Sequence, residues 1–367
     1  MDFTNKYKQQ ADKLKGFSTF EGKHKTKWQS PSNIALVKYW GKRGNQIPQN
    51  PSLSFTLRNS FTETEISYIY REQPGISIEF LFEGKPNPDF EERIRKHLLT
   101  LQEFLPFLNS LGLTINSSNS FPHSSGIASS ASAMSALVLG LCSIERDLFG
   151  TLQNEKDFLQ KASFLSRLCS GSAARSVYGG FTVWGKDGHV AGSSDEIAIP
   201  PEIKIHPDFL GLNDSILITS PEKKKISSSR GHSLMNGHPY AEVRYDQARA
   251  NLSKLIKILQ TGDERGFISI IENEALCLHA LMMSSNPGFT LLNQDTWNII
   301  HAVREFREAN NLMLAFTLDA GPNVHLIYPE KDKNKIVRFI SNELIPYCFR
   351  EMWIDDRMGE GPTEIYA

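Results

Sequence analysis

The pattern of apolar and polar positions in this 367-residue chain changes several times along its length. In the first half, apolar and polar residues alternate over several short segments, as they do in half-buried strands. Longer segments rich in Ala, Leu and Ser, or with charged and apolar faces, predict helices. The strands predicted there are 33–40, 53–57, 64–70, 76–80, 113–115 and 179–185, and the helices are 90–104, 129–148 and 153–168.

The second half has short apolar strands among long helical segments. Its predicted strands are 215–219, 312–318 and 324–328, and its predicted helices are 241–260, 265–283, 296–310 and 335–343. Strands and helices come in blocks without βαβ alternation, which predicts an α+β fold. Pro200, Pro201 and Pro207 predict a boundary between lobes 26–205 and 206–367, and the polar, Lys-rich residues 1–25 are expected to form a loosely held extension.

Composition narrows the class of protein. Hydrophobic residues make up 40% of the chain and charged residues 22%, which are ordinary values for a soluble globular protein. The 40 basic and 41 acidic residues leave a net charge of -1, so a non-specific nucleic-acid binder is not expected. The four cysteines form no CxxC unit or metal-ligand spacing, so we expect free thiols in the cytoplasm. We expect neither a signal peptide nor a membrane-spanning helix.

One candidate for phosphate binding is the small-residue segment 122–132, PHSSGIASSAS, at the start of a predicted helix. Small residues let a ligand approach the backbone, and hydroxyl and N–H groups at a helix start bind phosphate oxygens. No GxxxxGK[ST] sequence exists in the chain, so this is not a Walker loop. An ordinary Ser-rich helix N-cap remains the alternative.

The segment 38–42, KYWGK, has a Lys at the end of an apolar strand. A buried Lys is unfavourable without a partner, so Lys38 and Lys42 could hold a phosphate or pair with an acid. An edge-strand Lys that reaches solvent is the alternative.

Three further segments carry charged residues beside turns. Arg175 follows the small-residue turn SGSAA at 170–174 and could clamp a carboxylate or phosphate, although a surface loop is the alternative. Asp319 lies where an apolar strand meets a Gly-Pro turn and could act as a base, or only form the turn. The segment 223–231, KKKISSSRG, has three solvated Lys residues, and its Ser-Arg pair could complete an anion site.

Taken together and in this order, the five segments resemble the mevalonate diphosphate decarboxylases of the GHMP small-molecule kinase superfamily. The resemblance runs from about Ser30 to Tyr328, and its most specific part is 170–175 with Tyr178-Gly179-Gly180. It implies two lobes: an N-terminal lobe like domain 2 of ribosomal protein S5, and an α+β C-terminal lobe. The active-site cleft would lie between them. His123 departs from the small residues usual after the loop proline.

The resemblance also implies residue roles. Asp319 would face the C3 hydroxyl of the substrate, Lys38 would orient Asp319, and Arg175 would join them as a catalytic residue. The substrate-binding residues would be Tyr39, Lys42, Ser170, Gly171, Ser172, Arg175, Ser229 and Arg230. The ATP-binding residues would be Pro122, Ser124, Ser125, Gly126, Ile127, Ala128, Ser129 and Ser130. Mg²⁺ would be bound through the ATP phosphates, with Ser129 as a ligand.

The implied activity is the ATP-dependent decarboxylation of mevalonate 5-diphosphate to isopentenyl diphosphate, which belongs to isoprenoid biosynthesis. Two sibling activities stay open: a phosphomevalonate decarboxylase and a mevalonate 3-kinase. A catalytically inactive ligand sensor on the same fold is an alternative of another class. The family is often homodimeric, so a cytoplasmic homodimer without nucleic-acid or membrane partners is expected.

Overall fold

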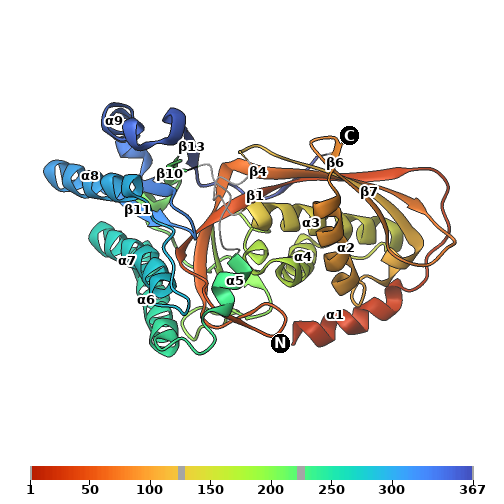
Figure 1. Ribbon diagram of the computed structural model, residues 1–367. Helices are drawn as coiled ribbons and strands as arrows, with labels where there is room; N and C mark the ends of the chain where they lie inside the picture. Colours follow the sequence, from red (N-terminus) through yellow and green to blue (C-terminus); the bar gives the residue numbers. More distant parts are fainter. Residues whose placement is uncertain (1, 123–128, 221–227, 366–367) are drawn as a thin grey trace.

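The computed structural model describes residues 2–122, 129–220 and 228–365, and most strands of this part belong to one large sheet (Figure 1). Its strands are β1 (His24–Val37), β4 (Ser52–Tyr70), β5 (Ser77–Phe82), β6 (Lys85–Pro86), β7 (Leu111–Asn119), β8 (Phe181–Trp184), β9 (Ala198–Ile199) and β14 (Thr363–Glu364). The order is β14-β1-β4-β7-β5-β6, with β8 paired to β4 and β9 to β8. All of these pairs are antiparallel except β5 with β7.

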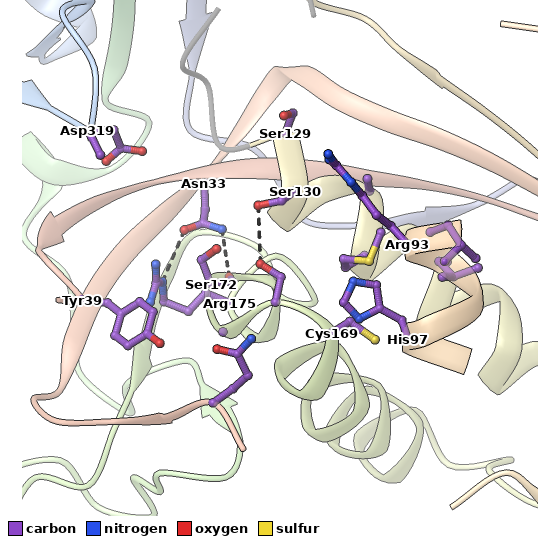
Figure 2. Close-up of a pocket in the computed structure, with 18 of the residues that line it drawn as sticks. Asn33, Tyr39, Arg93, His97, Ser129, Ser130, Cys169, Ser172, Arg175 and Asp319 are labelled. Carbon is purple, nitrogen blue, oxygen red and sulfur yellow. Dashed lines mark hydrogen bonds between the residues drawn. The ribbon is translucent and has the colours of Figure 1, made fainter. Parts of the chain in front are cut away.

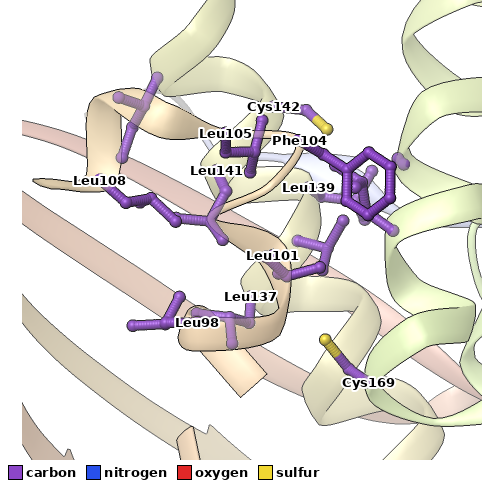
Figure 3. Close-up of a cluster of buried hydrophobic side chains, with 14 of the residues drawn as sticks. Leu98, Leu101, Phe104, Leu105, Leu108, Leu137, Leu139, Leu141, Cys142 and Cys169 are labelled. Atoms are coloured by element: carbon purple, nitrogen blue, oxygen red, sulfur yellow. The ribbon is translucent and has the colours of Figure 1, made fainter. Parts of the chain in front are cut away.

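Three helices cover one face of the large sheet: α2 (Pro88–Leu101), α3 (Ser129–Phe149) and α4 (Glu155–Cys169) (Figure 1). Their apolar faces meet in a cluster of leucines and phenylalanines that includes Leu98, Leu101, Phe104, Leu137 and Leu141 (Figure 3). Each of these side chains is buried, and full burial of a Leu or Phe contributes roughly 1.5–3 kcal/mol. The cluster fixes α3, and therefore the helix start at Ser129, against the sheet.

A smaller antiparallel sheet has the order β11-β12-β10-β13. Its strands are β10 (Asn213–Leu217), β11 (Ala315–Leu318), β12 (Val324–Tyr328) and β13 (Trp353–Arg357). Its helices are α6 (Ala241–Thr261), α7 (Glu264–Met283), α8 (Gln294–Asn310) and α9 (Lys333–Phe339). Three further short elements are β2 (Lys42–Arg43), β3 (Ile47–Pro48) and α5 (Ser228–Ser233). Both sheets combine with separate helical blocks, so the α+β prediction is confirmed.

The two sheets share one hydrophobic core where β1 and β4 run toward the smaller sheet. Ile34 and Leu36 of β1 and Phe55 of β4 pack in the same buried cluster as Leu252 of α6 and Ile271 of α7. This shared core holds the end of β1 at the junction between the lobes, and the residues that follow β1 therefore face both of them.

β4 is one continuous strand where the alternation predicted two. The polar residues Arg58 and Asn59 interrupt the apolar pattern, but their backbone N–H groups donate to the Asp356 carboxylate of β13 at 3.0 and 2.7 Å. This contact from the other sheet satisfies the backbone there, and no local sequence signal reveals it. The prediction also missed α5 and the strands β2, β3, β6, β9, β13 and β14.

The expectation of a loosely held N-terminal extension is wrong. Helix α1 (Phe3–Ala11) follows Asp2, whose side chain accepts the Asn5 amide N–H as an N-cap. Phe3 and Tyr7 are buried in the cluster that contains α2, α3 and α4. The Glu196 carboxylate accepts the Phe3 amide N–H at 2.8 Å, which holds the helix start in place. The polar composition of this segment led to the wrong prediction, because it gave no weight to the two aromatic residues that are buried.

α7 is long and apolar enough to cross a membrane by length and composition alone, but half of its apolar stretch is buried inside the protein. Two of its acidic residues, Glu272 and Glu274, pair with Arg307 and Arg244. α7 also packs against β11 and α6. These contacts are those of a core helix.

Candidate active site

A cavity of about 730 Å³ opens at the junction of the two lobes, with several of the predicted site residues in its wall (Figure 2). The segments after β1, at the start of α3, after α4 and after β11 all contribute to it. The predicted residues that line it are Lys38, Tyr39, Lys42, Ser129, Ser130, Ser170, Gly171, Ser172, Arg175 and Asp319. Segments separated by up to 281 positions in the sequence therefore meet at one site.

Lys38 and Asp319 form an ion pair across the lobe junction. Lys38 follows the last residue of β1, Asp319 follows the last residue of β11, and Lys38 Nζ lies 3.1 Å from Asp319 Oδ1. The Lys38 side chain is 2% exposed and that of Asp319 25%. Burial lowers the pKa of Lys38, and the Asp319 carboxylate opposes that shift. The ammonium is therefore placed to favour the ionised form of the carboxylate.

A second layer of polar residues holds Lys38 by its backbone. Glu274 of α7 accepts the Lys38 amide N–H at 2.8 Å, and the Asn50 side chain donates to the Lys38 carbonyl at 2.9 Å. The Glu274 carboxylate also pairs with Arg244 of α6, and both side chains are almost fully buried. His279 Nε2 lies 3.0 Å from the Asp319 carbonyl oxygen. None of these residues was predicted, because each lies inside a helix or loop without a motif of its own.

Arg175 is buried and held by three neutral side chains. Its Nε donates to Ser54 Oγ at 2.9 Å and lies 3.3 Å from Asn33 Oδ1, while Nη1 donates to Ser52 Oγ at 2.7 Å. Its guanidinium also lies 5.8 Å from the centre of the Trp184 ring. Burial lowers the pKa of Arg175 to about 10, a value at which the group stays charged at neutral pH. These contacts leave Nη2 without a partner among the described residues, so it can bind an anion.

Tyr39 and Lys42 add two further donors to the same wall. The Tyr39 hydroxyl is buried and has no hydrogen-bond partner among the described residues. Lys42 Nζ donates to Gln46 Oε1 at 2.9 Å, and burial lowers the pKa of Lys42. The Tyr39 ring packs closely on Gly171, where a Cβ atom would lie 3.1 Å from Tyr39 and 2.7 Å from Trp184. A side chain at 171 would therefore displace the rings that form this wall.

The predicted ATP-binding and substrate-binding segments meet at two serines. Ser130 Oγ at the start of α3 lies 3.5 Å from Ser170 Oγ after α4 (Figure 2). The Ser172 carbonyl accepts the Asn33 side-chain amide at 3.2 Å, which fixes the turn between Ser170 and Arg175. The two segments thus lie side by side, as a transfer from one ligand to the other requires.

Several predicted residues do not line the cavity, and others lie outside the part of the chain that the structure describes. Pro122 and Arg230 are exposed and do not belong to the lining residues. Ser229 is the second residue of α5. Outside the described residues lie His123, Ser124, Ser125, Gly126, Ile127, Ala128, Lys223, Lys224 and Lys225.

The cavity continues into a part that the sequence did not predict. Its wall there comes from β5, α2 and α3 and contains Phe82, Phe90, Arg93, His97 and Met134. The guanidinium of Arg93 lies 5.6 Å from the centre of the Phe90 ring. An aromatic and apolar slot with an arginine beside it can hold a planar ring. The cavity wall thus combines charged and polar residues such as Lys38, Arg175 and Asp319 with these aromatic and apolar ones.

Comparison with known proteins gives concordant results. Residues 30–198 match the family model of the diphosphomevalonate decarboxylase-like N-terminal domain, and residues 215–358 match that of the mevalonate 5-diphosphate decarboxylase C-terminal domain. A curated diphosphomevalonate decarboxylase from Ganoderma lucidum is 29% identical over 333 residues, which cover 85% of this chain and 80% of that protein.

Solved structures agree with these matches. The crystal structure of mevalonate diphosphate decarboxylase from Staphylococcus aureus has a TM-score of 0.80 and 29% identity, with 95% of this chain and 100% of that chain covered. A structure described as MDDEF in complex with MVAPP, AMPPCP and magnesium has a TM-score of 0.78 and 25% identity, with 94% and 100% covered.

Proposed function

The chain belongs to the diphosphomevalonate decarboxylase family, and from this premise we propose that it is an ATP-dependent decarboxylase. Its substrate is (R)-5-diphosphomevalonate, and its products are isopentenyl diphosphate, ADP, phosphate and CO₂. The observation that carries this proposal is the 3.1 Å contact between Lys38 Nζ and Asp319 Oδ1, in a cavity that Arg175 also lines.

The first step is phosphorylation of the substrate. The substrate has a tertiary alcohol at C3, β to a carboxylate, and loss of CO₂ requires that alcohol to become a good leaving group. Asp319 accepts the proton of the C3 hydroxyl as the hydroxyl oxygen attacks the γ-phosphorus of ATP, and ADP leaves with the electrons of the broken P–O bond. Lys38 orients the Asp319 carboxylate and keeps it ionised until that proton arrives.

The second step is decarboxylation. The C3 phosphate leaves with its bonding electrons, so positive charge develops at C3. The electrons of the bond to the carboxylate carbon then form the new double bond, and CO₂ departs. Arg175 is held by Ser52 and Ser54, so its guanidinium fixes the geometry of the anionic substrate. An arginine held this rigidly does not move with the substrate carboxylate as that carboxylate loses its charge.

ATP and Mg²⁺ are proposed as co-substrate and cofactor, supported by the related structure that contains AMPPCP and magnesium. The described residues contain no group of three or more His, Cys, Asp and Glu that could hold a metal ion. This fits Mg²⁺, which binds mainly through phosphates and water with one or two protein oxygens. The Ser129 hydroxyl at the start of α3 would supply one such oxygen. When bound, Mg²⁺ neutralises charge on the transferred phosphoryl group.

Three other functions are less well supported. A mevalonate 3-kinase would phosphorylate without decarboxylation, and we expect such an enzyme to have an altered acid–lysine pair, whereas Lys38 and Asp319 are both present and in contact here. A phosphomevalonate decarboxylase would differ in its contacts to the second phosphate. A ligand sensor would not need a base beside a buried cation, so ATP turnover separates it from all three enzymes.

The deciding experiment supplies the full chain with ATP, Mg²⁺ and carboxyl-labelled mevalonate 5-diphosphate, and measures ADP and labelled CO₂. Equal amounts of both products are expected. ADP without CO₂ would mean a 3-kinase. Neither product, with turnover of mevalonate 5-phosphate instead, would mean the monophosphate enzyme. No turnover of either compound would favour a sensor.

We also propose that the protein acts as a cytoplasmic homodimer. All four of its cysteines are free thiols, which suits a reducing compartment. The homodimer is expected from the family alone. Cell fractionation and light scattering of the purified protein would test the two expectations separately.

A further inference from the structure

His232 of α5 has no role in the mechanism above, although it forms part of the cavity wall and is only 8% exposed. Its ring lies between two aromatic rings, with centroids 4.3 Å from that of Tyr39 and 4.7 Å from that of Trp40. Gly231 brings α5 close enough for this contact, because a Cβ atom there would lie 2.5 Å from the Trp40 ring. The ring of His232 is therefore held in one orientation.

The hydrogen bonds of His232 define its tautomer. The backbone N–H of Gly41 donates to His232 Nδ1 at 3.0 Å. Because an amide nitrogen only donates, Nδ1 must accept, and the ring proton of the neutral form is on Nε2. Burial, together with the nearby charges of Lys42 and Arg175, lowers the pKa of His232 to about 3. The ring therefore stays neutral, with Nε2–H as its donor.

The Nε2–H group has no hydrogen-bond partner among the described residues. Unlike the Tyr39 hydroxyl, Nε2 is not among the fully buried atoms without a partner, so a ligand or water in the cavity can accept its hydrogen bond. The same wall carries the Lys42 ammonium, the free Nη2 of Arg175 and the partnerless Tyr39 hydroxyl. Donors and positive charges that converge in this way suit a polyanion.

We propose that His232 is a further substrate-binding residue, whose neutral Nε2–H donates a hydrogen bond to a phosphate oxygen of the substrate. This assignment rests on the proposed function for the nature of the phosphate compound. His232 comes from the C-terminal lobe, whereas Tyr39 and Gly41 follow β1, so the same side chain joins the two lobes beside the bound phosphate. Its Nδ1 holds the lobes together, and its Nε2 holds the substrate.

Two substitutions separate these tasks. Asn at 232 keeps an acceptor near the position of Nδ1 and loses the Nε2 donor, whereas Gln keeps a donor near Nε2 and loses the Nδ1 acceptor. Binding of mevalonate 5-diphosphate, without ATP, would be measured by calorimetry on the full chain. His232→Asn should raise Kd about 10-fold or more, as for a lost hydrogen bond to a charged group, and His232→Gln should stay within about 3-fold of wild type.

His238→Asn is the matched control. His238 Nδ1 also accepts an amide N–H, from Tyr240 at 3.1 Å, but His238 does not line the cavity. This variant should change Tm and leave Kd unchanged. Weaker binding by His232→Gln than by His232→Asn would overturn the assignment, and the only remaining role of His232 would be its contact between the lobes. A wild-type Kd in His232→Asn would overturn the assignment in the same way. If His232→Asn fails to fold, near-wild-type Kd in His232→Gln supports the assignment and a 10-fold rise overturns it. If the wild-type chain does not bind mevalonate 5-diphosphate, both the proposed function and the assignment of His232 are overturned.

Discussion

Replacing Asp319 by Asn tests the pair with Lys38 most directly, because it removes the charge and the base and keeps the shape of the side chain. The amide oxygen can still accept a hydrogen bond from Lys38 Nζ, which lies 3.1 Å away in the wild-type protein. Loss of a general base typically reduces the rate by about 10²- to 10⁴-fold, or roughly 2.7–5.4 kcal/mol in the activation barrier. The loss should be in kcat, because no predicted ATP contact involves Asp319.

The same substitution should change how stability depends on pH. Burial lowers the pKa of Lys38, and Asp319 is the strongest influence that opposes it, so the pKa falls further in Asp319→Asn. Unfolded Lys keeps its proton to a pKa of about 10.4. Between the folded and unfolded pKa values the unfolded state binds more protons, and the folded state therefore gains stability as pH rises. The stability deficit of the variant should thus narrow as pH rises toward about 10.4.

The assays are CO₂ release at saturating substrates and urea denaturation at several pH values. Asp246→Asn is the control, since Asp246 also pairs with a cation but its side chain is 80% exposed. That control should change neither quantity appreciably. Activity of Asp319→Asn within a few-fold of wild type would refute the role as a base. A stability deficit that does not change as pH rises toward about 10.4 would refute the reasoning about the buried ammonium.

Two further substitutions and one deletion test other parts of the structure. Glu274→Gln strands the buried Arg244 guanidinium and should lower the free energy of unfolding by about 3–5 kcal/mol in urea; a loss below 1 kcal/mol would contradict the buried pair. Tyr39→Phe removes a hydroxyl that has no partner among the described residues, so Tm should stay unchanged. KM for the phosphorylated substrate should rise about 10-fold, and an unchanged KM would exclude a ligand contact of this hydroxyl. Deleting residues 2–14 should lower Tm by on the order of 5 °C because the buried Phe3 and Tyr7 are lost, and an unchanged thermal melt would contradict their packing.

Sequence reasoning identified those candidate site residues whose immediate neighbours in the chain are unusual. Lys38 stood out as a charge at the end of an apolar strand, and Asp319 as an acid before a Gly-Pro turn. Both features are local, and both residues line the cavity. The residues that orient them gave no such signal: Glu274 lies among apolar and polar residues of a helix, and its importance depends on a partner 30 positions away.

Backbone contacts between distant segments account for the errors in the predicted fold. β4 continues through Arg58 because Asp356, almost 300 positions later, accepts its amide N–H. α1 packs on the helical layer because Glu196 holds its start and Phe3 and Tyr7 are spaced to face the same side. Alternation and composition describe the side chains of one segment only, so partners of this kind cannot be read from them.

A change at Glu274 should affect both catalytic activity and stability, whereas a change at α1 should affect stability alone. Lys38 is held through its amide by Glu274, which belongs to the buried pair with Arg244 at the junction of the lobes. Loss of Glu274 should therefore reduce the free energy of unfolding and also displace Lys38 from Asp319. No residue of α1 lines the cavity, so its loss should reduce stability and leave kcat of the remaining folded protein unchanged. Equal losses of kcat in both variants would mean that activity follows global stability and that the Glu274 contact has no special role in positioning Lys38.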